Sequence, residues 1–421
     1  MKSTSIALAS KHRVAALAPN ESIAKNLLFK VLRGMTKGCL RLHDQGEVFE
    51  FGQIASDADL VADIHVHNPA FYSDVVFGGS VAAGEAYMSD YWSTPNLTQV
   101  VRLFVRNMDA LDNLDNSQSF IGRLLLKVFH WFNRNTKSGS RRNISAHYDL
   151  GNDFFKLFLD ETMMYSSAIY PTPDAELSVA SVYKLQRVCE KLQLNQEDHL
   201  LEIGTGWGGM AIHAARHYGC RVTTTTISKE QHDYAVARIA AAGLSDKITV
   251  LFDDYRDLSG SFSKLVSIEM IEAVGHAHYD DYFSACAKLL RPDGLMLIQA
   301  ITMKDQRYKR ALKSVDFIQR YIFPGGSLPS IDVISNCVQR KTDLNILQIE
   351  DIGEHYAQTL KHWRELFMAQ LDTVKDQGFD ERFIRMWEFY LCYCEGGFRE
   401  RSIGTAQILF AKPDYRSHFF S

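Results

Sequence analysis

The sequence predicts an α/β protein of two domains, the second built on a doubly wound, mostly parallel sheet. Three observations carry this prediction. The chain has 421 residues, which exceeds the usual size of a single hydrophobic core. Its second half alternates apolar, strand-like runs with helix-like segments. A glycine-rich turn joins the first of these strands to the helix that follows it.

Short apolar runs within residues 22–110 predict the first domain, a small mixed α/β fold. The apolar pattern gives way to a polar stretch with Gly and Ser just before residue 140, so we place the boundary there. Residues 1–140 then form an N-terminal domain with a basic linker. Residues 141–421 form the sheet domain.

The elements of the sheet domain follow in order along the chain. Strands are predicted near 199–203, 221–227, 247–252, 264–269 and 295–302, and helices near 208–218, 229–242 and 278–290. The Pro-Gly turn at 291–294 is predicted to separate the last of these helices from its strand. Two later β-rich runs, 345–352 and 405–411, bring the sheet to seven strands, with helices from about 356 to 399 between them.

The composition argues against a general nucleic-acid-binding protein. The formal net charge is −4, whereas binding many phosphates requires a basic surface. The seven cysteines are scattered without C-x-x-C spacing, which indicates reduced thiols and no metal site. Apolar blocks of the kind found in signal peptides and membrane spans do not occur. We therefore expect a cytoplasmic enzyme with no nucleic-acid partner.

One segment departs from this acidic average. Residues 120–142 contain no acidic side chain and interleave cations with large apolar residues. The cations are Arg123, Lys127, Arg134, Lys137, Arg141 and Arg142, and the apolar residues include Phe120, Leu124, Leu125, Phe129, Trp131 and Phe132. This pattern predicts an amphipathic helix on an anionic phospholipid bilayer, which would make the protein peripheral on the inner face of the membrane. The alternative is a docking helix followed by a solvated linker.

The glycine turn at 204–209 predicts a cofactor site. Gly204 and Gly206 let the backbone turn tightly and allow a ligand to approach amide groups at a helix N-terminus. A dinucleotide site would place an acid at the end of the next strand, and that strand carries none. Glu202 instead precedes the first glycine, which resembles class I methyltransferases that use S-adenosylmethionine (AdoMet). A dinucleotide and a purely structural turn are the alternatives.

Ordered motifs along nearly the whole chain resemble the cyclopropane-fatty-acyl-phospholipid synthase family in its long form, which implies that residues 1–140 are an N-terminal lipid-associated domain. They include HYDLGNDFFKLFLDETMMYSSAIY at 147–170, LEIGTGWGG at 201–209, SIEMIEAVGHAHYDDYF at 267–283 and YIFPGGSLPS at 321–330. The resemblance implies a class I methyltransferase, Rossmann-like seven-stranded sheet. It also implies transfer of the AdoMet methyl carbon to a cis double bond of a phospholipid acyl chain, followed by closure of a cyclopropane ring.

The resemblance carries the AdoMet contacts over to positions of this sequence. They are Tyr165, Ser166, Glu202, Gly204, Gly206, Thr226, Ile227, Gln231, Asp254 and Tyr255. Thr226 and Gln231 would provide uncharged hydrogen bonds where an acid commonly holds the ribose.

Catalytic positions follow in the same way. Similar enzymes bind bicarbonate as a base through a cysteine, a glutamate, a histidine, a tyrosine and an isoleucine backbone. The matching positions are Ser167, Glu272, Gln299, Tyr356 and Ile301. Serine and glutamine replace the usual cysteine and histidine, although both can still donate hydrogen bonds to an anion. Aromatic faces stabilise cations, and Tyr321 and Tyr356 are our candidates for that role.

The two replacements leave the product open. Without the imidazole, the cation formed on the chain can end as a methyl- or methylene-branched or furan-precursor acyl chain, finished by a redox partner enzyme. A methyltransferase for a soluble small molecule and a lipid-binding protein with a decayed catalytic shell are further alternatives. A homodimer is compatible with the resemblance.

Overall fold

The structure is a computed structural model that describes residues 19–56, 60–108 and 150–416. The basic segment predicted to contact lipid, residues 120–142, lies outside the described residues. The chain divides into two compact units, residues 1–119 and 120–421. Each unit is described by itself below.

The first unit contains a four-stranded mixed sheet with helices. Its elements are α1 (Pro19–Leu32), β1 (Gly38–Asp44), β2 (Glu47–Gln53), β3 (Val61–Val66), α2 (Ala70–Met88), β4 (Trp92–Ser93) and α3 (Leu97–Arg106). The strand order is β2-β1-β3-β4, with β1 antiparallel to β2 and parallel to β3. Leu40 and Leu42 of β1 are fully buried. The small mixed α/β fold predicted for this region is confirmed.

In the described part of the second unit, two helices precede the large sheet. The helices are α7 (Asn152–Phe155), α8 (Leu177–Lys191), α9 (Gly209–Tyr218), α10 (Lys229–Ala241), α11 (Ile271–Val274), α12 (Tyr279–Leu289), α13 (Asp305–Ala311), α14 (Phe317–Tyr321), α15 (Ile331–Lys341), α16 (Gly353–Ala369), α17 (Leu371–Asp376) and α18 (Glu381–Arg399). The strands are β5 (His199–Ile203), β6 (Arg221–Thr225), β7 (Ile248–Leu251), β8 (Phe262–Ile268), β9 (Leu290–Met303), β10 (Asn345–Asp351) and β11 (Ile403–Ala411). Short 3₁₀ turns occupy Tyr255–Asp257 and His276–His278.

The seven strands lie in the order β10-β11-β9-β8-β5-β6-β7. Strands β5 to β9 pair in parallel, and β11 runs antiparallel to both of its neighbours. The predicted seven-stranded, mostly parallel sheet is therefore confirmed. From β5 the chain passes outward to β6 and β7 and then crosses back to β8 on the other side of β5, which places the topological switch point between β5 and β8.

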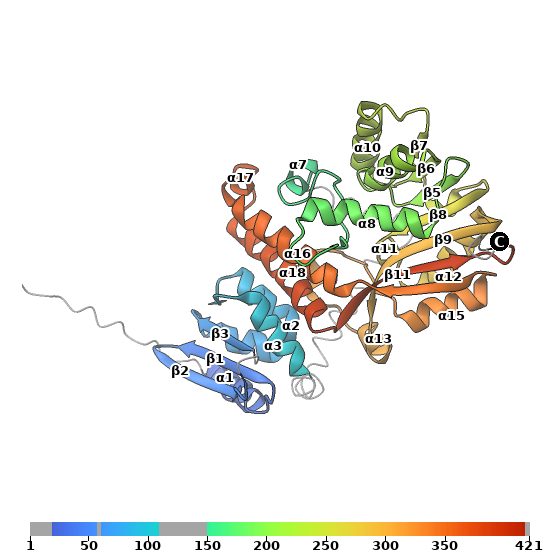
Figure 1. Ribbon diagram of the computed structural model, residues 1–421. Helices are drawn as coiled ribbons and strands as arrows, with labels where there is room; N and C mark the ends of the chain where they lie inside the picture. The colour runs from blue at the N-terminus through green and yellow to red at the C-terminus, as the bar shows by residue number, and fades with distance from the viewer. Residues whose placement is uncertain (1–18, 57–59, 109–149, 417–421) are drawn as a thin grey trace, which may run out of the picture. The chain divides into compact units, whose positions relative to one another are not determined.

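Helices cover both faces of this sheet (Figure 1). Leu200 packs in a core with residues of α8 and α9, whereas its neighbour Leu201 packs with residues of α12 and α15. Successive strand side chains point to opposite faces, so a strand covered on both sides is apolar throughout. This explains why the parallel strands appear in the sequence as continuous apolar runs.

One predicted turn is wrong. Residues 291–294 do not form a turn between α12 and its strand, because strand β9 begins at Leu290, directly after the helix. The carbonyl groups of Pro292 and Gly294 accept hydrogen bonds from Asp414 and Lys412. The chain that follows β11 thus holds this Pro-Gly segment, while the register of β9 against β8 shifts between Leu290 and Leu295.

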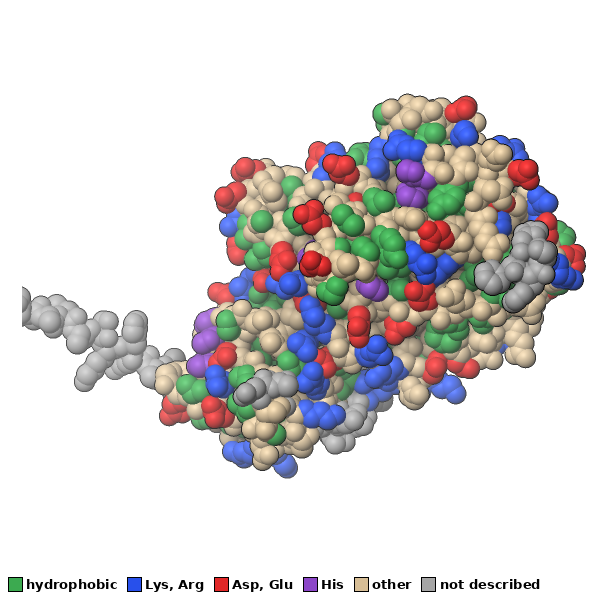
Figure 2. All heavy atoms as spheres, in the orientation of Figure 1, with side chains coloured by type: hydrophobic (Ala, Val, Ile, Leu, Met, Phe, Trp, Pro, Cys, Tyr) green, Lys and Arg blue, Asp and Glu red, His purple; other side chains and the backbone are tan. Residues whose placement is uncertain are grey.

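The face shown in Figure 2 carries acidic and basic side chains together, as the near balance of 46 Lys and Arg with 50 Asp and Glu predicts. All seven cysteines are free thiols. Of the helices described, none combines the length and the apolar character that crossing a bilayer requires.

Candidate active site

The carboxyl ends of the parallel strands gather most of the predicted site residues along one edge of the sheet. Ligands in open α/β sheets bind outside these strand ends, near the switch point. Strands β5 and β6 carry the predicted AdoMet residues there. Strand β9 carries the catalytic candidates Gln299 and Ile301, and Glu272 follows β8.

The glycine turn after β5 has the geometry of a ligand cradle. Gly204, Gly206 and Gly208 have backbone φ of 101°, 51° and 86°, a region that residues other than glycine rarely adopt. A Cβ built on Gly206 would meet no atom within 4 Å. The turn leads into the N-terminus of α9, where backbone N–H groups favour a ligand with negative charge. The open space at Gly206 therefore fits the methionine end of AdoMet.

Glu202 lies on β5 immediately before this turn. It is buried, and its carboxyl accepts a hydrogen bond of 2.7 Å from Thr224 on β6. Desolvation raises the pKa of Glu202 to about 8, against the opposing effects of Thr224 and Lys184. The hydrogen bond from Thr224 therefore fixes the Glu202 carboxyl at the end of β5, close to the predicted ligand.

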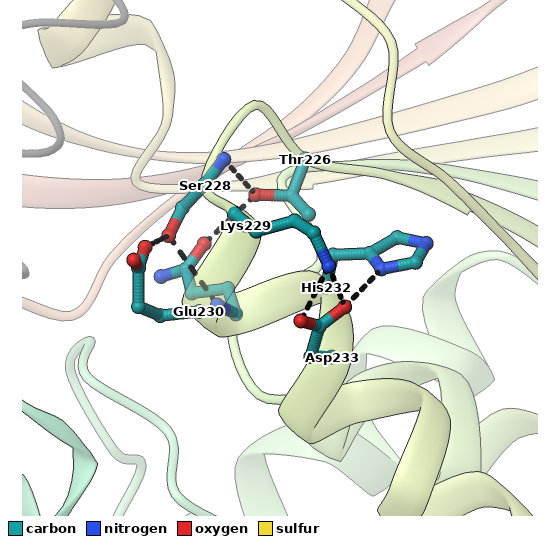
Figure 3. A network of polar contacts seen from close by, with 7 residues as sticks. Thr226, Ser228, Lys229, Glu230, His232 and Asp233 are labelled. Atoms are coloured by element: carbon teal, nitrogen blue, oxygen red, sulfur yellow. Dashed lines mark hydrogen bonds and ion pairs between the residues drawn. The ribbon is translucent and has the colours of Figure 1, made fainter.

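The turn after β6 is held by side-chain hydrogen bonds (Figure 3). The Thr226 hydroxyl donates to Gln231 Oε1 at 2.9 Å and accepts from the Ser228 backbone N–H. Ser228 caps α10 by accepting from the Gln231 N–H. Within the described chain nothing hydrogen-bonds Gln231 Nε2, so this amide keeps two donors for ribose hydroxyl groups. Ile227, between them, is half-buried.

The turn after β7 is organised by an ion pair. Asp254 is buried and accepts hydrogen bonds from the Arg256 side chain and backbone N–H, at 2.6 to 3.0 Å. The Tyr255 ring packs against the ring of Tyr282, with the centroids 5.6 Å apart. The predicted contact of Asp254 and Tyr255 with adenine remains a prediction, since their described partners belong to the protein.

Glu269, which is not among the predicted site residues, lies among the predicted catalytic residues at the ends of β8 and β9. Its Oε1 accepts hydrogen bonds from the Ser167 backbone N–H at 2.9 Å and from Gln299 Nε2 at 2.8 Å. Its Oε2 accepts from the Tyr356 hydroxyl at 2.8 Å. Desolvation raises the pKa of Glu269, and these three hydrogen bonds and Lys184 oppose the rise. The carboxyl is therefore held by donors from three separate segments.

A series of side-chain hydrogen bonds, called here the polar chain, leads from Gln299 away from Glu269. Gln299 is fully buried, and its Oε1 accepts from Gln407 Nε2 at 2.9 Å. Gln407 Oε1 accepts in turn from Lys191 Nζ at 2.6 Å, and Lys191 also pairs with Glu350. The Lys191 ammonium group can only donate, which fixes the direction of the whole series. Lys191 donates to Gln407, Gln407 donates to Gln299, and Gln299 donates to Glu269.

Glu272 lies on α11, three residues beyond Glu269. Its Oε1 accepts a hydrogen bond from the Ile301 backbone N–H. Its Oε2 is buried and has no hydrogen-bond partner among the described residues. Desolvation, and next the charge of Glu269, raise the pKa of Glu272 to about 8. A buried polar atom of this kind is costly, which favours a role in binding or catalysis.

An aromatic wall borders these carboxyl groups. Tyr356 stacks on Phe398 with the ring centroids 4.6 Å apart, and it lies edge-on to Trp363 at 6.1 Å. Tyr165 packs against Trp363 at 5.1 Å, and its hydroxyl lies 2.9 Å from the Tyr390 hydroxyl. Such rings exclude water and stabilise a nearby cation.

A buried lysine on α8 lies near carboxyl groups of the site and hydrogen-bonds to Ser166, which follows Tyr165 of the aromatic wall. Lys184 is fully buried and donates to the Ser166 hydroxyl at 2.9 Å. Desolvation lowers the pKa of Lys184 to about 8, and the nearby charges of Glu269, Asp160 and Glu202 oppose the shift. Its charge therefore lies among the acids of both halves of the site.

The catalytic roles predicted for Ser167 and Tyr321 remain predictions. Ser167 contributes its backbone N–H to the site, because its hydroxyl donates to the Ala168 carbonyl at 2.9 Å instead. Tyr321, at the end of α14, packs against Phe317 with centroids 5.0 Å apart, and the Arg320 guanidinium lies over its ring.

The predicted bicarbonate residues do not fit a free anion. The donors of Ser167, Gln299 and Tyr356 point to Glu269, and the Ile301 N–H points to Glu272. Both Glu269 and Lys184 escape sequence reasoning, although an acid three residues before Glu272 in SIEMIE is a usable signal. A lone lysine within a helical pattern offers none.

Comparison with known proteins places this geometry in a family. Residues 135–408 match the family model described as mycolic acid cyclopropane synthetase. The chain is 39% identical over 410 residues to the tuberculostearic acid methyltransferase of Mycobacterium tuberculosis, covering 95% of this chain and 93% of that protein. It is 36% identical over 366 residues to the cyclopropane-fatty-acyl-phospholipid synthase of Escherichia coli, covering 87% of this chain and 92% of the relative.

Solved structures agree. A mycolic acid cyclopropane synthase complexed with SAH and CTAB superposes with a TM-score of 0.61 at 32% identity, covering 65% of this chain and 98% of that one. A cyclopropane synthase from Mycobacterium tuberculosis gives a TM-score of 0.60 at 29% identity, with the same coverage of 65% and 98%. AdoMet is therefore the cofactor, and the dinucleotide alternative for the glycine turn is set aside.

Proposed function

The chain belongs to the mycolic acid cyclopropane synthetase family of AdoMet-dependent methyltransferases, and from this premise we propose that it methylates a cis double bond in a phospholipid acyl chain. The observation that carries the proposal is the cluster of Glu269 and Glu272 beside an aromatic wall at the cofactor edge of the sheet. Carboxyl groups suit a reaction that makes a cation and then removes a proton.

Bound AdoMet supplies an electrophilic methyl carbon. An alkene is a weak nucleophile, so the protein must hold the double bond in line with that carbon and exclude water. Such positioning contributes about 7 to 11 kcal/mol to lowering the barrier. The rings of Tyr165 and Tyr356 stabilise the cation that forms on the acyl chain, and the site's carboxyl groups handle the proton that leaves.

Ring closure is the first candidate outcome. It is supported by the family model and by the cyclopropane synthase relative from Escherichia coli, which aligns over 87% of this chain. Methylation without ring closure is the second. It is supported by the tuberculostearic acid methyltransferase, which aligns over 95% of the chain, and by Gln299 in place of the usual histidine. A branched, saturated product would need a redox partner enzyme.

We also propose that residues 120–142 bring the enzyme to the inner membrane face. The segment has six cations and no acid, and each cation near an anionic bilayer contributes about 1 kcal/mol. Its aromatic residues would enter the interface, giving peripheral association. Removing the six charges should weaken binding to anionic vesicles and leave AdoMet binding unchanged.

The test is direct. The protein is incubated with AdoMet and vesicles of a cis-monounsaturated phospholipid, and the acyl chains are analysed by mass spectrometry. The proposal predicts a mass gain of one CH₂ unit, with the alkene lost in a ring product and retained in a methylene-branched product. Vesicles with saturated chains are the matched control. Methyl transfer to a soluble acceptor with no gain in any acyl chain would contradict the proposal.

A further inference from the structure

The anion site that the resemblance predicts already contains a carboxylate of the chain itself. Of the five positions matched to bicarbonate ligands, Ser167, Gln299 and Tyr356 donate to Glu269, at 2.8 to 2.9 Å. The other two, Ile301 and Glu272, hydrogen-bond to each other. Building on the proposed function, we propose that Glu269 replaces bicarbonate as the base, so that this enzyme needs no added anion.

Shape and charge support the replacement. A carboxylate and bicarbonate both present two oxygens on one planar carbon, so the same set of donors satisfies either. A second anion beside Glu269 would meet a charge of the same sign. At about 4 Å, two such charges repel by roughly 4 kcal/mol at an effective dielectric constant of 20. The donors therefore serve one anion, and the chain provides it.

The polar chain behind Gln299 makes this arrangement directional. Lys191 donates to Gln407, Gln407 to Gln299, and Gln299 to Glu269. Gln299 consequently presents an N–H group to the site. An amide N–H cannot take a proton at neutral pH, unlike the imidazole expected here from the resemblance. The proton acceptor must be another group, and Gln299 acts as a positioning residue for it.

The backbone at Glu269 is also unusual. Its φ is 49°, in the left-handed region, which costs a residue other than glycine of order 1 to 3 kcal/mol. The Glu269 N–H donates to the Gln299 carbonyl at 2.7 Å and holds the residue in this conformation. Strain of this kind persists where the surroundings fix it, and it is typical of functional sites.

The two carboxylate oxygens differ in capacity. Oε1 accepts two hydrogen bonds, from Ser167 and Gln299, whereas Oε2 accepts one, from Tyr356. Each carboxylate oxygen has two lone pairs, so Oε2 keeps one for a proton. Oε2 is therefore the atom that receives it.

In the proposed step the alkene attacks the AdoMet methyl group, and the resulting cation then loses a proton. The alkene π electrons form a bond to the methyl carbon as the carbon–sulfur bond breaks, and the other alkene carbon becomes a cation. Glu269 Oε2 then takes a proton from the added carbon. The electrons of that C–H bond form the third side of the ring, or a methylene double bond if a hydride shift has moved the cation. Glu269 ends as a carboxylic acid and returns its proton to solvent.

The first test uses the wild-type protein in buffer depleted of carbon dioxide, with and without added bicarbonate. The proposal predicts equal turnover on cis-unsaturated vesicles in both. Turnover that collapses on depletion and returns with bicarbonate would overturn it. A wild-type protein that modifies no acyl chain in either buffer would instead contradict the proposed function, so the two failures are distinguishable.

The second test removes the carboxylate. Glu269→Gln should lower kcat at least 100-fold, within the usual contribution of general base catalysis, and leave AdoMet affinity unchanged by calorimetry. Glu269→Ala opens space among the donors, so added formate or bicarbonate should raise its turnover several-fold. Unchanged turnover in the Gln variant would overturn the proposal. So would an Ala variant that binds AdoMet normally but gains nothing from either anion.

Discussion

The two halves of the sheet edge hold their ligands by different means. The half formed by β5 and β6 offers a ligand open space at Gly206 and the uncharged Thr226–Gln231 pair, while its one predicted carboxyl, Glu202, accepts a hydrogen bond from Thr224. The half formed by β8 and β9 uses two ionisable carboxyl groups, Glu269 and Glu272, with converging donors. The first arrangement accepts a ligand, and the second accepts a proton.

This difference predicts that the halves fail differently when altered. Changes in the carboxyl half should lower kcat and spare AdoMet binding, whereas changes in the glycine half should weaken AdoMet binding first. A change in the carboxyl half that mainly weakens AdoMet binding would contradict this expectation, as would a change in the glycine half that lowers only kcat.

The largest effect is expected from Glu272→Gln. The amide oxygen can still accept from Ile301, but an amide nitrogen replaces Oε2, the buried oxygen that has no hydrogen-bond partner among the described residues. We expect kcat to fall about 10²- to 10⁴-fold, with AdoMet affinity unchanged by calorimetry. Glu365→Gln, at an exposed carboxyl on α16, is the matched control and should retain full turnover. Full turnover in Glu272→Gln would contradict its assigned role.

Tyr356→Phe tests a single hydrogen bond in the same half of the site. It removes one hydrogen bond to Glu269 and keeps the ring that stacks on Phe398. A hydrogen bond to a charged group contributes about 1.5 to 3 kcal/mol, so kcat should fall about 10- to 100-fold. Equal losses in kcat and in AdoMet affinity would instead indicate general unfolding of the site.

Gly206→Ala tests the glycine half. The protein leaves room for a Cβ there, so the methyl group would project into space that the cofactor needs. We expect AdoMet to bind about 10-fold more weakly, equivalent to roughly 1.4 kcal/mol. Gly243→Ala is a matched control, since Gly243 also has positive φ (67°) and open surroundings and lies beyond α10. It should share the stability cost and leave AdoMet affinity unchanged.

The smallest effect concerns stability and pH. Desolvation raises the pKa of Glu202 to about 8 from an ordinary value of 4.5. Between these pH values the unfolded chain releases a proton that the folded protein keeps, so the free energy of unfolding falls as pH rises. Urea denaturation across this range should show a negative slope that Glu202→Gln reduces. A slope that Glu202→Gln leaves unchanged would assign the effect to other groups.

Sequence reasoning reaches the two halves unequally. Strand ends and the glycine turn depend on local patterns, and the structure places them as expected. Glu269 receives its donors from segments that are about 30 to 100 residues away along the chain, as the separations of 30, 87 and 102 positions show. The sheet brings those segments together, and the local SIEMIE pattern shows only that a second acid lies near Glu272.

The orientation of Ser167 illustrates the same limit. Sequence matching assigns the position, but the hydroxyl turns to the Ala168 carbonyl, and the backbone N–H faces Glu269. The Pro-Gly segment at 291–294 fails for a related reason, because its pairing partners lie beyond β11. Turn residues predict a turn only where no distant strand offers hydrogen bonds.

The most direct test of the account follows the three hydrogens of the transferred methyl group. AdoMet carrying a fully deuterated methyl group is supplied with cis-monounsaturated phospholipid vesicles, and the label in the acyl product is counted by mass spectrometry. The account predicts a product with two deuterium atoms on the added carbon, because the base removes one. A product that keeps all three, or an acyl chain without label, would contradict it.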